Sequence, residues 1–292
     1  MSLFQYDFMI RALIGALVIG VAAPAIGIYL VQRRMSLIGD GVGHVALTGV
    51  GVGLLLNRSP VIAAVIVAAV GAIAIELVRE RGRTSGDMAL ALLFYGGIAG
   101  GVLLVGLSDS SSAALTSYLF GALTTTSRAD LITIAVLGVV ILVTMIALRP
   151  ALFAICHDEE YARVAGLPVR ALNLLLAVAT AVTVTIAMRA VGLLLISALM
   201  VVPVATAQQI TRGFRATMAA AVGLGLATSA AGIWLAAVAD TAPGATIVVL
   251  AVGSFLVVAL GNAVWRTVRR RLRTAATGMT AEVGPPEVVL ER

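Results

Sequence analysis

Residues 35–56 read MSLIGDGVGHVALTGVGVGLLL, a glycine-rich apolar stretch that contains one carboxylate, Asp40, and one imidazole, His44. A double arginine, Arg33-Arg34, precedes it. An apolar run of about 20 residues has the length of a helix that crosses a bilayer. Ionisable side chains are costly inside such a helix, and they usually face a bundle interior or an aqueous path. The stretch therefore predicts a membrane helix that carries a polar pair.

The rest of the chain has the same character. Of its 292 residues, 61% are hydrophobic and 12% are charged, and the mean hydropathy of +1.09 is not that of a soluble domain. The apolar runs are continuous and show no alternation, which favours helices over strands. We expect an all-α, polytopic membrane protein with about nine transmembrane segments, eight being possible, near residues 8–31, 37–56, 61–78, 88–107, 131–148, 171–189, 190–210, 216–238 and 245–263.

The basic residues indicate how the chain is oriented. The net charge of +6 would suggest a nucleic-acid partner for a soluble protein, but here every basic residue is arginine and most lie in short loops between apolar runs. Fifteen of the 20 arginines fall in alternate loops. Because cytoplasmic loops carry the excess of positive charge, we expect an external N-terminus and a cytoplasmic C-terminus. The single cysteine, Cys156, excludes an internal disulfide.

Two segments depart from the pattern of spans. Residues 113–126, AALTSYLFGALTTT, are apolar but too short to cross, so they predict a re-entrant or interfacial half-helix. Residues 274–292 contain Gly-Pro-Pro and are expected to form a disordered cytoplasmic tail. Residues 1–273 are then a single transmembrane domain.

Asp40 and His44 are the first candidate site. At positions i and i+4 of a helix, both side chains lie on one face, and they offer an oxygen and a nitrogen ligand to a divalent transition metal. One chain supplies only two ligands, whereas two copies related by a two-fold axis would supply four. The alternative is structural: Asp40 stabilises the helix dipole and His44 hydrogen-bonds to a carbonyl. The spacing alone leaves both interpretations open.

Residues 156–168, CHDEEYARVAGLP, form the second candidate site. Three acidic residues at 158–160 open a short helical stretch, and Gly166 and Pro168 close it. In a cytoplasmic loop this pattern predicts either a docking helix for a soluble partner or a solvated turn. Glu76 is a further ionisable residue in an apolar run, and we expect it to form a salt bridge with Arg79 or Arg81 at the membrane boundary.

Other features concern packing and chemistry. Gly96, Gly97, Gly100 and Gly101 predict close helix contacts, and Pro203 predicts a kinked or unwound helix. The sequence contains no phosphate-binding loop, and it has too few histidines for a readable Ser/His/Asp set. We therefore expect no enzymatic activity in this chain, so a partner or an ion gradient must supply the energy for any transport.

Four stretches in this order resemble the ABC-3 family, the membrane permeases of metal-uptake ABC transporters. They are RRMSLIGDGVGHVALTGV at 33–50, the segment 158–169, ISALMVVPVATA at 196–207 and PGATIV at 243–248. The resemblance covers almost all of residues 8–265. Gly41 and Gly43 stand where alanine and serine are more usual in that family, but both candidate ligands are in place.

The resemblance implies a permease subunit of an ATP-driven importer in a bacterial inner or plasma membrane. It implies a dimer of permease chains, a cytoplasmic ATP-binding subunit and an extracytoplasmic metal-binding protein, with no permanently bound cofactor. The transported ion would be zinc, which we favour, or manganese or iron, and it would pass Asp40 and His44. A permease for siderophores or cobalamin and a gradient-driven secondary transporter are the alternatives. The residues that the resemblance assigns to coupling with the ATPase are Asp158, Glu159, Glu160, Ala162, Gly166 and Pro168.

Overall fold

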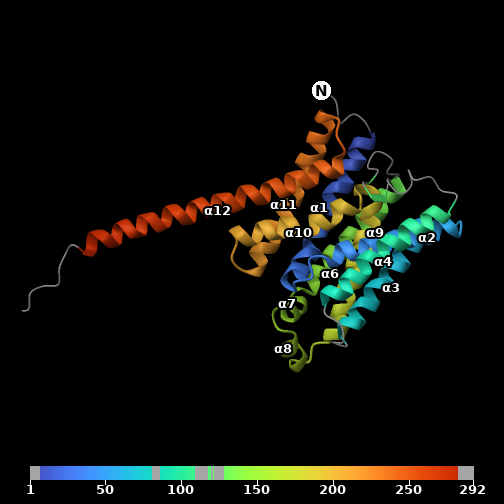
Figure 1. Ribbon diagram of the computed structural model, residues 1–292, viewed down its shortest axis with the longest axis horizontal. Coiled ribbons are helices and arrows are strands. Elements are labelled where there is room, and N and C mark those ends of the chain that lie inside the picture. Colours follow the sequence, from blue (N-terminus) through green and yellow to red (C-terminus); the bar gives the residue numbers. More distant parts are fainter. Residues whose placement is uncertain (1–6, 81–85, 109–117, 120, 122–127, 282–292) are drawn as a thin grey trace, which may run out of the picture.

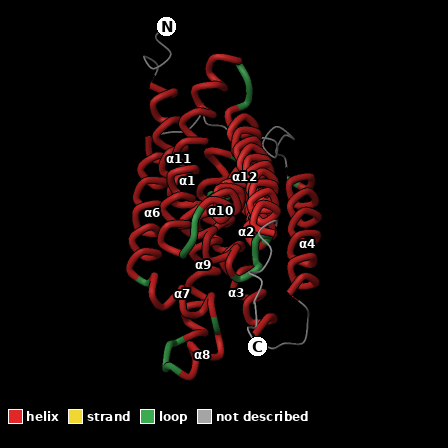
Figure 2. Tube along the Cα trace, turned by 90° about the vertical axis from the view of Figure 1, so that its left-hand side faces the viewer, coloured by secondary structure: helices red, strands yellow, loops and turns green. Residues whose placement is uncertain are grey.

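The computed structural model describes residues 7–80, 86–108, 118–119, 121 and 128–281. Within these residues the chain consists of helices joined by short loops, without a strand (Figure 2). The all-α class predicted from the sequence is therefore correct for the described chain. The helices are α1 (Asp7–Gln32), α2 (Ile38–Leu55), α3 (Pro60–Glu80), α4 (Gly86–Leu107), α6 (Arg128–Ala147), α7 (Arg149–His157), α8 (Glu159–Val164), α9 (Val169–Val191), α10 (Leu193–Ile210), α11 (Phe214–Ala239) and α12 (Pro243–Ala281) (Figure 1).

The described helices do not confirm nine spans, but they allow up to the eight that the sequence left possible. Seven of the described helices are long and apolar enough to cross a membrane, and α6 with α7, which bend by 66° at their junction, add an eighth if they form one span. The remaining predicted segment, 190–210, corresponds to α10. Its apolar part, Leu195–Ile210, is shorter than the helices that are long enough to count as spans.

A glycine determines where α9 ends and α10 begins. Gly192 adopts a φ of +90° between the two helices, a conformation that L side chains rarely adopt. The sequence placed the boundary between these two segments at 189/190, within a few residues of the break that the structure shows. Pro203 lies inside the continuous helix α10, which is therefore not unwound there.

Helix α1 forms the centre of the bundle. It is the most buried of the candidate spans, and α6, α9, α10 and α11 pack around it. Small residues allow the closest approaches, as at Gly20, where an added Cβ would lie 2.8 Å from the carbonyl oxygen of Gly225 on α11. Near the C-terminal end of α1, the buried Tyr29 hydroxyl donates a hydrogen bond of 2.9 Å to the Met145 carbonyl of α6.

Helix α2, which carries the polar pair, is held between α3, α4 and α9. Three of the four glycines expected to mediate packing do so on α4: an added Cβ would lie within 3 Å of α2 atoms at Gly97, Gly100 and Gly101. Gly96 has open space beside it. The close contact of α4 therefore fixes the position of α2 through backbone as well as side chains.

The C-terminal helix is longer than the last predicted span. Helix α12 extends far beyond the bundle (Figure 1) and continues to Ala281, so it includes residues 274–281 of the predicted tail. Arginine and alanine, both good helix formers, are frequent in 269–276 and sustain the helix. Residues 282–292 lie outside the described residues, as does most of the predicted half-helix 113–126. Of the latter, Tyr118 and Leu119 are helical and pack against the core.

Candidate functional site

The first candidate site lies in the first two turns of α2. Asp40 and His44 are on one face of the helix, and the Asp40 Oδ1 atom lies 3.8 Å from His44 Nε2. The His44 side chain is 8% exposed and that of Asp40 is 24% exposed. Both groups thus lie inside a candidate membrane span, and the carboxylate is the more accessible of the two.

The imidazole of His44 is held by α4. The ring of Phe94 lies edge-on to it, with ring centroids 4.4 Å apart, and Gly97 allows the α4 backbone to approach the His44 backbone. The buried Nδ1 atom of His44 has no hydrogen-bond partner among the described residues, so this nitrogen does not bond to a described carbonyl. Asp40 lies in the first turn of α2, where a carboxylate favours the helix dipole.

The pair is an incomplete ligand set within one chain. No group of three or more His, Cys, Asp or Glu side chains suitable for a metal ion occurs in the part of the chain that the structure describes. Two donors are fewer than the four of a tetrahedral site. Further ligands would have to come from another molecule, from water or from a second copy of the chain.

The second candidate site is the short helix α8, which lies beyond α7 at one extremity of the bundle (Figures 1 and 2). The Asp158 side chain caps it by accepting a hydrogen bond of 2.9 Å from the Tyr161 amide. Gly166 ends it with a φ of +81°, and Pro168 immediately precedes α9. The start and stop signals that the sequence contained therefore define a real helix.

The side chains of α8 divide between two directions. Ala162 is completely buried against the bundle, whereas Tyr161 and Val164 are 69% and 88% exposed. Glu160 is also exposed. An apolar and acidic surface of this kind, at the end of a helical bundle, is suited to contact with another protein.

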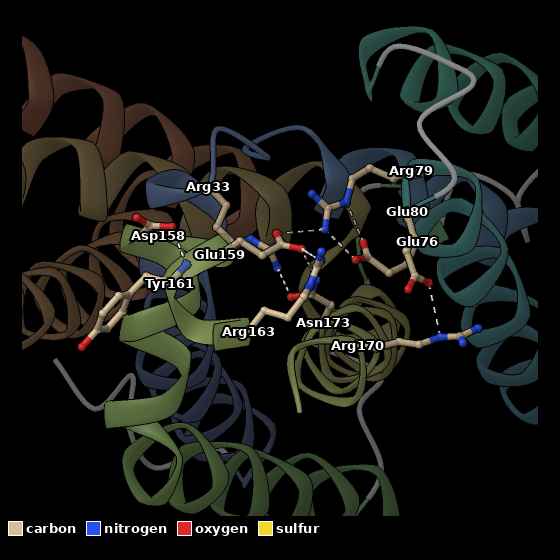
Figure 3. Close-up of polar contacts among 10 residues, drawn as sticks. All are labelled: Arg33, Glu76, Arg79, Glu80, Asp158, Glu159, Tyr161, Arg163, Arg170 and Asn173. Atoms are coloured by element: carbon tan, nitrogen blue, oxygen red, sulfur yellow. Dashed lines mark hydrogen bonds and ion pairs between the residues drawn. The ribbon is translucent and has the colours of Figure 1, made fainter. Parts of the chain in front are cut away.

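An ionic cluster that was not predicted from the sequence lies between α8 and the ends of α1, α3 and α9 (Figure 3). The Arg33 guanidinium donates hydrogen bonds of 3.1 Å to Glu159 Oε2 and 2.7 Å to Asn173 Oδ1. Arg79 donates two hydrogen bonds, of 2.6 and 3.0 Å, to Glu76, so the salt bridge expected for Glu76 is confirmed with this partner. Arg81 lies outside the described residues.

Burial makes Arg33 the unusual member of this ionic cluster. Its side chain is 6% exposed. Desolvation by this burial, together with the positive charge of nearby Arg79, lowers the pKa of the Arg33 guanidinium from its usual value. The negative charges of Glu76 and Glu159 oppose this shift. The double arginine and a lone asparagine in an apolar run were visible in the sequence. Their meeting at Glu159, which is 126 residues from Arg33, was not.

An open cavity of about 760 Å³ adjoins the ionic cluster, between the ends of α3, α8 and α9. Its lining includes Arg79, Glu159 and Arg163, together with the surface ion pair between Arg170 and Glu80, which are 3.2 Å apart. Arg33, Arg79 and Arg170 belong to three loops that the arginine distribution placed on one side of the membrane. Their meeting at one end of the bundle agrees with that grouping.

Comparison with known proteins identifies the family. The model of the ABC 3 transport family matches residues 5–262. A manganese transport system membrane protein, MntC, of Halalkalibacterium halodurans is 31% identical over 86% of each chain. The high-affinity zinc uptake system membrane protein ZnuB of Haemophilus influenzae is 30% identical over 84% of this chain and 94% of its own.

Solved structures agree with this assignment. A chain of PsaBC from Streptococcus pneumoniae, solved in complex with Fab, superposes with a TM-score of 0.79 and 29% identity over 88% of this chain and 92% of that chain. An inward-facing conformation of a putative metal-chelate type ABC transporter shares the fold, with a TM-score of 0.66 at 17% identity over 89% of this chain and 90% of that chain. The chain therefore belongs to the ABC 3 transport family, whose resemblance the sequence motifs had indicated, and it is a multi-pass membrane protein.

Proposed function

We propose that this member of the ABC 3 transport family is the membrane permease of an ATP-driven importer for divalent transition-metal ions. Support comes from relatives of nearly the same length that are named for manganese and zinc transport. It also comes from the position of one carboxylate and one imidazole inside a buried membrane helix. The energy would come from a cytoplasmic ATP-binding subunit, because the sequence has no phosphate-binding loop.

The observation that carries the proposal is the Asp40–His44 pair. Its two donors, 3.8 Å apart at Oδ1 and Nε2, suit a divalent ion in transit better than a closed cage would, because a conducting site must also release its ion. A second copy of the chain would bring a matching pair to a shared axis. We therefore propose a dimer with the ion path along that axis.

The remaining parts of the importer follow from the same proposal. An extracytoplasmic metal-binding protein delivers the ion, and α8 receives the ATP-binding subunit through its exposed surface at Glu160, Tyr161 and Val164. The N-terminus then lies outside and the C-terminus in the cytoplasm of a bacterial cell. Imidazole and carboxylate donors bind both zinc and manganese. We favour zinc as the transported ion. Competition between zinc, manganese and iron in whole-cell uptake distinguishes the three metals.

Uptake of labelled zinc and manganese by cells that express the complete transporter tests this function. Asp40→Asn and His44→Ala should each abolish accumulation, while the ATP-binding subunit still co-purifies with the permease. Asp240→Asn is the matched control, because it makes the same chemical change at an exposed carboxylate in the turn between α11 and α12 and should leave uptake unchanged. Normal uptake by both site variants would remove the pair from the ion path.

A further inference from the structure

We propose that Glu159 is a positioning residue that links movement of α8 to α2, the helix with Asp40 and His44. The inference rests on the proposed function, since it concerns how ATP-driven motion would reach the ion path. The resemblance to the ABC-3 family placed Glu159 and Glu160 together in one coupling set. In the structure Glu160 is exposed, whereas Glu159 turns toward the bundle, so we assign them different tasks.

Glu159 joins α8 to three other parts of the molecule (Figure 3). One carboxylate oxygen accepts the 3.1 Å hydrogen bond from Arg33, at the end of α1, and lies 3.9 Å from Arg79 of α3. The other oxygen lies 3.5 Å from Asn173 of α9 and 3.5 Å from Arg163 of α8 itself. A displacement of α8 therefore acts on the ends of α1, α3 and α9 together.

The turn after Arg33 connects this contact to α2. Arg34 has a φ of +58°, the Met35 amide donates a hydrogen bond of 2.8 Å to the Leu30 carbonyl, and the Ile38 amide donates one of 3.1 Å to the Met35 carbonyl. Ile38 begins α2 and is 1% exposed. Because the turn is short, hydrogen-bonded and anchored at a buried residue, movement of Arg33 is passed to the start of α2, two residues before Asp40.

The charges in the ionic cluster show why Arg33 depends on Glu159. Arg79 retains its two hydrogen bonds to Glu76 when Glu159 is neutralised. Among the described residues Arg33 forms no hydrogen bond or ion pair with another carboxylate, and it would keep only the neutral oxygen of Asn173. A buried cation that loses its anionic partner shifts or draws in water. Glu159→Gln thus acts mainly on the contact between α8 and the α1–α2 turn.

The test uses the permease reconstituted in liposomes with its ATP-binding subunit and metal-binding protein. Import of zinc or manganese and hydrolysis of ATP are measured in the same vesicles. In Glu159→Gln the ATP-binding subunit should still co-purify, and the number of ions imported per ATP should fall roughly tenfold, a typical size for coupling between two sites. Glu80→Gln is the matched control: it removes the exposed ion pair with Arg170 in the same cavity and should leave the ratio unchanged.

A second variant covers the possibility that Glu159→Gln destabilises the permease. Arg33→Gln with Glu159→Gln removes both charges, so that no buried cation is left unpaired, and its ratio of ions to ATP should be as low as in the single Glu159 variant, with no further loss. A wild-type ratio in either variant would overturn this inference alone. Absence of ATP-driven import by the wild-type complex would instead overturn the proposed function, and this inference with it.

Discussion

Replacement of Gly97 by alanine should separate α4 from α2 beside His44. An added Cβ would lie 2.6 Å from the carbonyl carbon of His44 and 2.6 Å from the amide nitrogen of Val45. The same backbone segment of α4 accepts a hydrogen bond of 2.8 Å from Thr48 to the Gly97 carbonyl. Because the obstructing atoms belong to the α2 backbone, no side chain can rotate to make room, and the helices themselves have to move.

The size of the effect follows from this geometry. Non-bonded carbon atoms prefer separations of about 3.5–4.0 Å, so the helices have to part by roughly 1 Å. Overpacking of this kind costs up to about 3 kcal/mol when the surroundings are rigid. Replacing glycine by alanine inside a helix stabilises the helix by about 1 kcal/mol. We therefore expect the free energy of unfolding to fall by a net amount of about 2 kcal/mol.

The adjacent glycine supplies the control. Gly96 lies in the same helix with nothing within 4 Å of an added Cβ, so Gly96→Ala gains the same helix propensity without the clash. The difference between the two alanine variants isolates the clash at about 3 kcal/mol, or roughly 6 °C in the midpoint of thermal unfolding in detergent for a chain of this size. We also expect lower metal uptake from Gly97→Ala only. Equal midpoints for the two variants would refute the argument that α4 fixes α2 through this backbone contact.

Two further predictions concern buried polar contacts. Tyr29→Phe removes the hydrogen bond to the Met145 carbonyl at the end of α6 and should lower the free energy of unfolding by about 1–2 kcal/mol, measured as a shift in thermal unfolding; an unchanged midpoint would mean that water replaces the hydroxyl. Glu76→Gln weakens the double hydrogen bond to Arg79 and should cost about 2 kcal/mol in the same assay, whereas Glu80→Gln at the exposed pair should cost less than about 1 kcal/mol. Equal effects of the two glutamate variants would show that burial of Glu76 does not strengthen its pair.

Much of this protein could be predicted from local patterns. Apolar runs of the length of a bilayer core predicted the candidate spans, because hydrophobicity summed over about 20 residues needs no knowledge of neighbours. The spacing of Asp40 and His44 predicted their common face, since four residues make about one helical turn. The acidic start and the Gly166 stop predicted α8 for the same reason: caps are satisfied within a few residues of the chain.

The differences between expectation and structure also have local causes. Hydropathy separated the segments 171–189 and 190–210, but it carries no signal for the backbone angle at Gly192 that divides α9 from α10. The tail from 274 was predicted from its Gly-Pro-Pro ending, and its first residues have good helix propensity and continue α12. The resemblance to the ABC-3 family assigned Glu159 and Glu160 to one coupling set, and only the structure shows that their side chains point in different directions.

What the sequence determined, then, was which segments enter the membrane and which polar residues share a helix face, because these depend on composition and helical period alone. The tertiary structure decided which residues each polar side chain contacts. Only packing brings Arg33 to Glu159 across 126 residues, sets Phe94 against His44 and turns one of two adjacent glutamates inward. These contacts join helices that are distant in the sequence but adjacent in space. Helix packing and the burial of charge determine which residues pair there, and local periodicity contains no information about either.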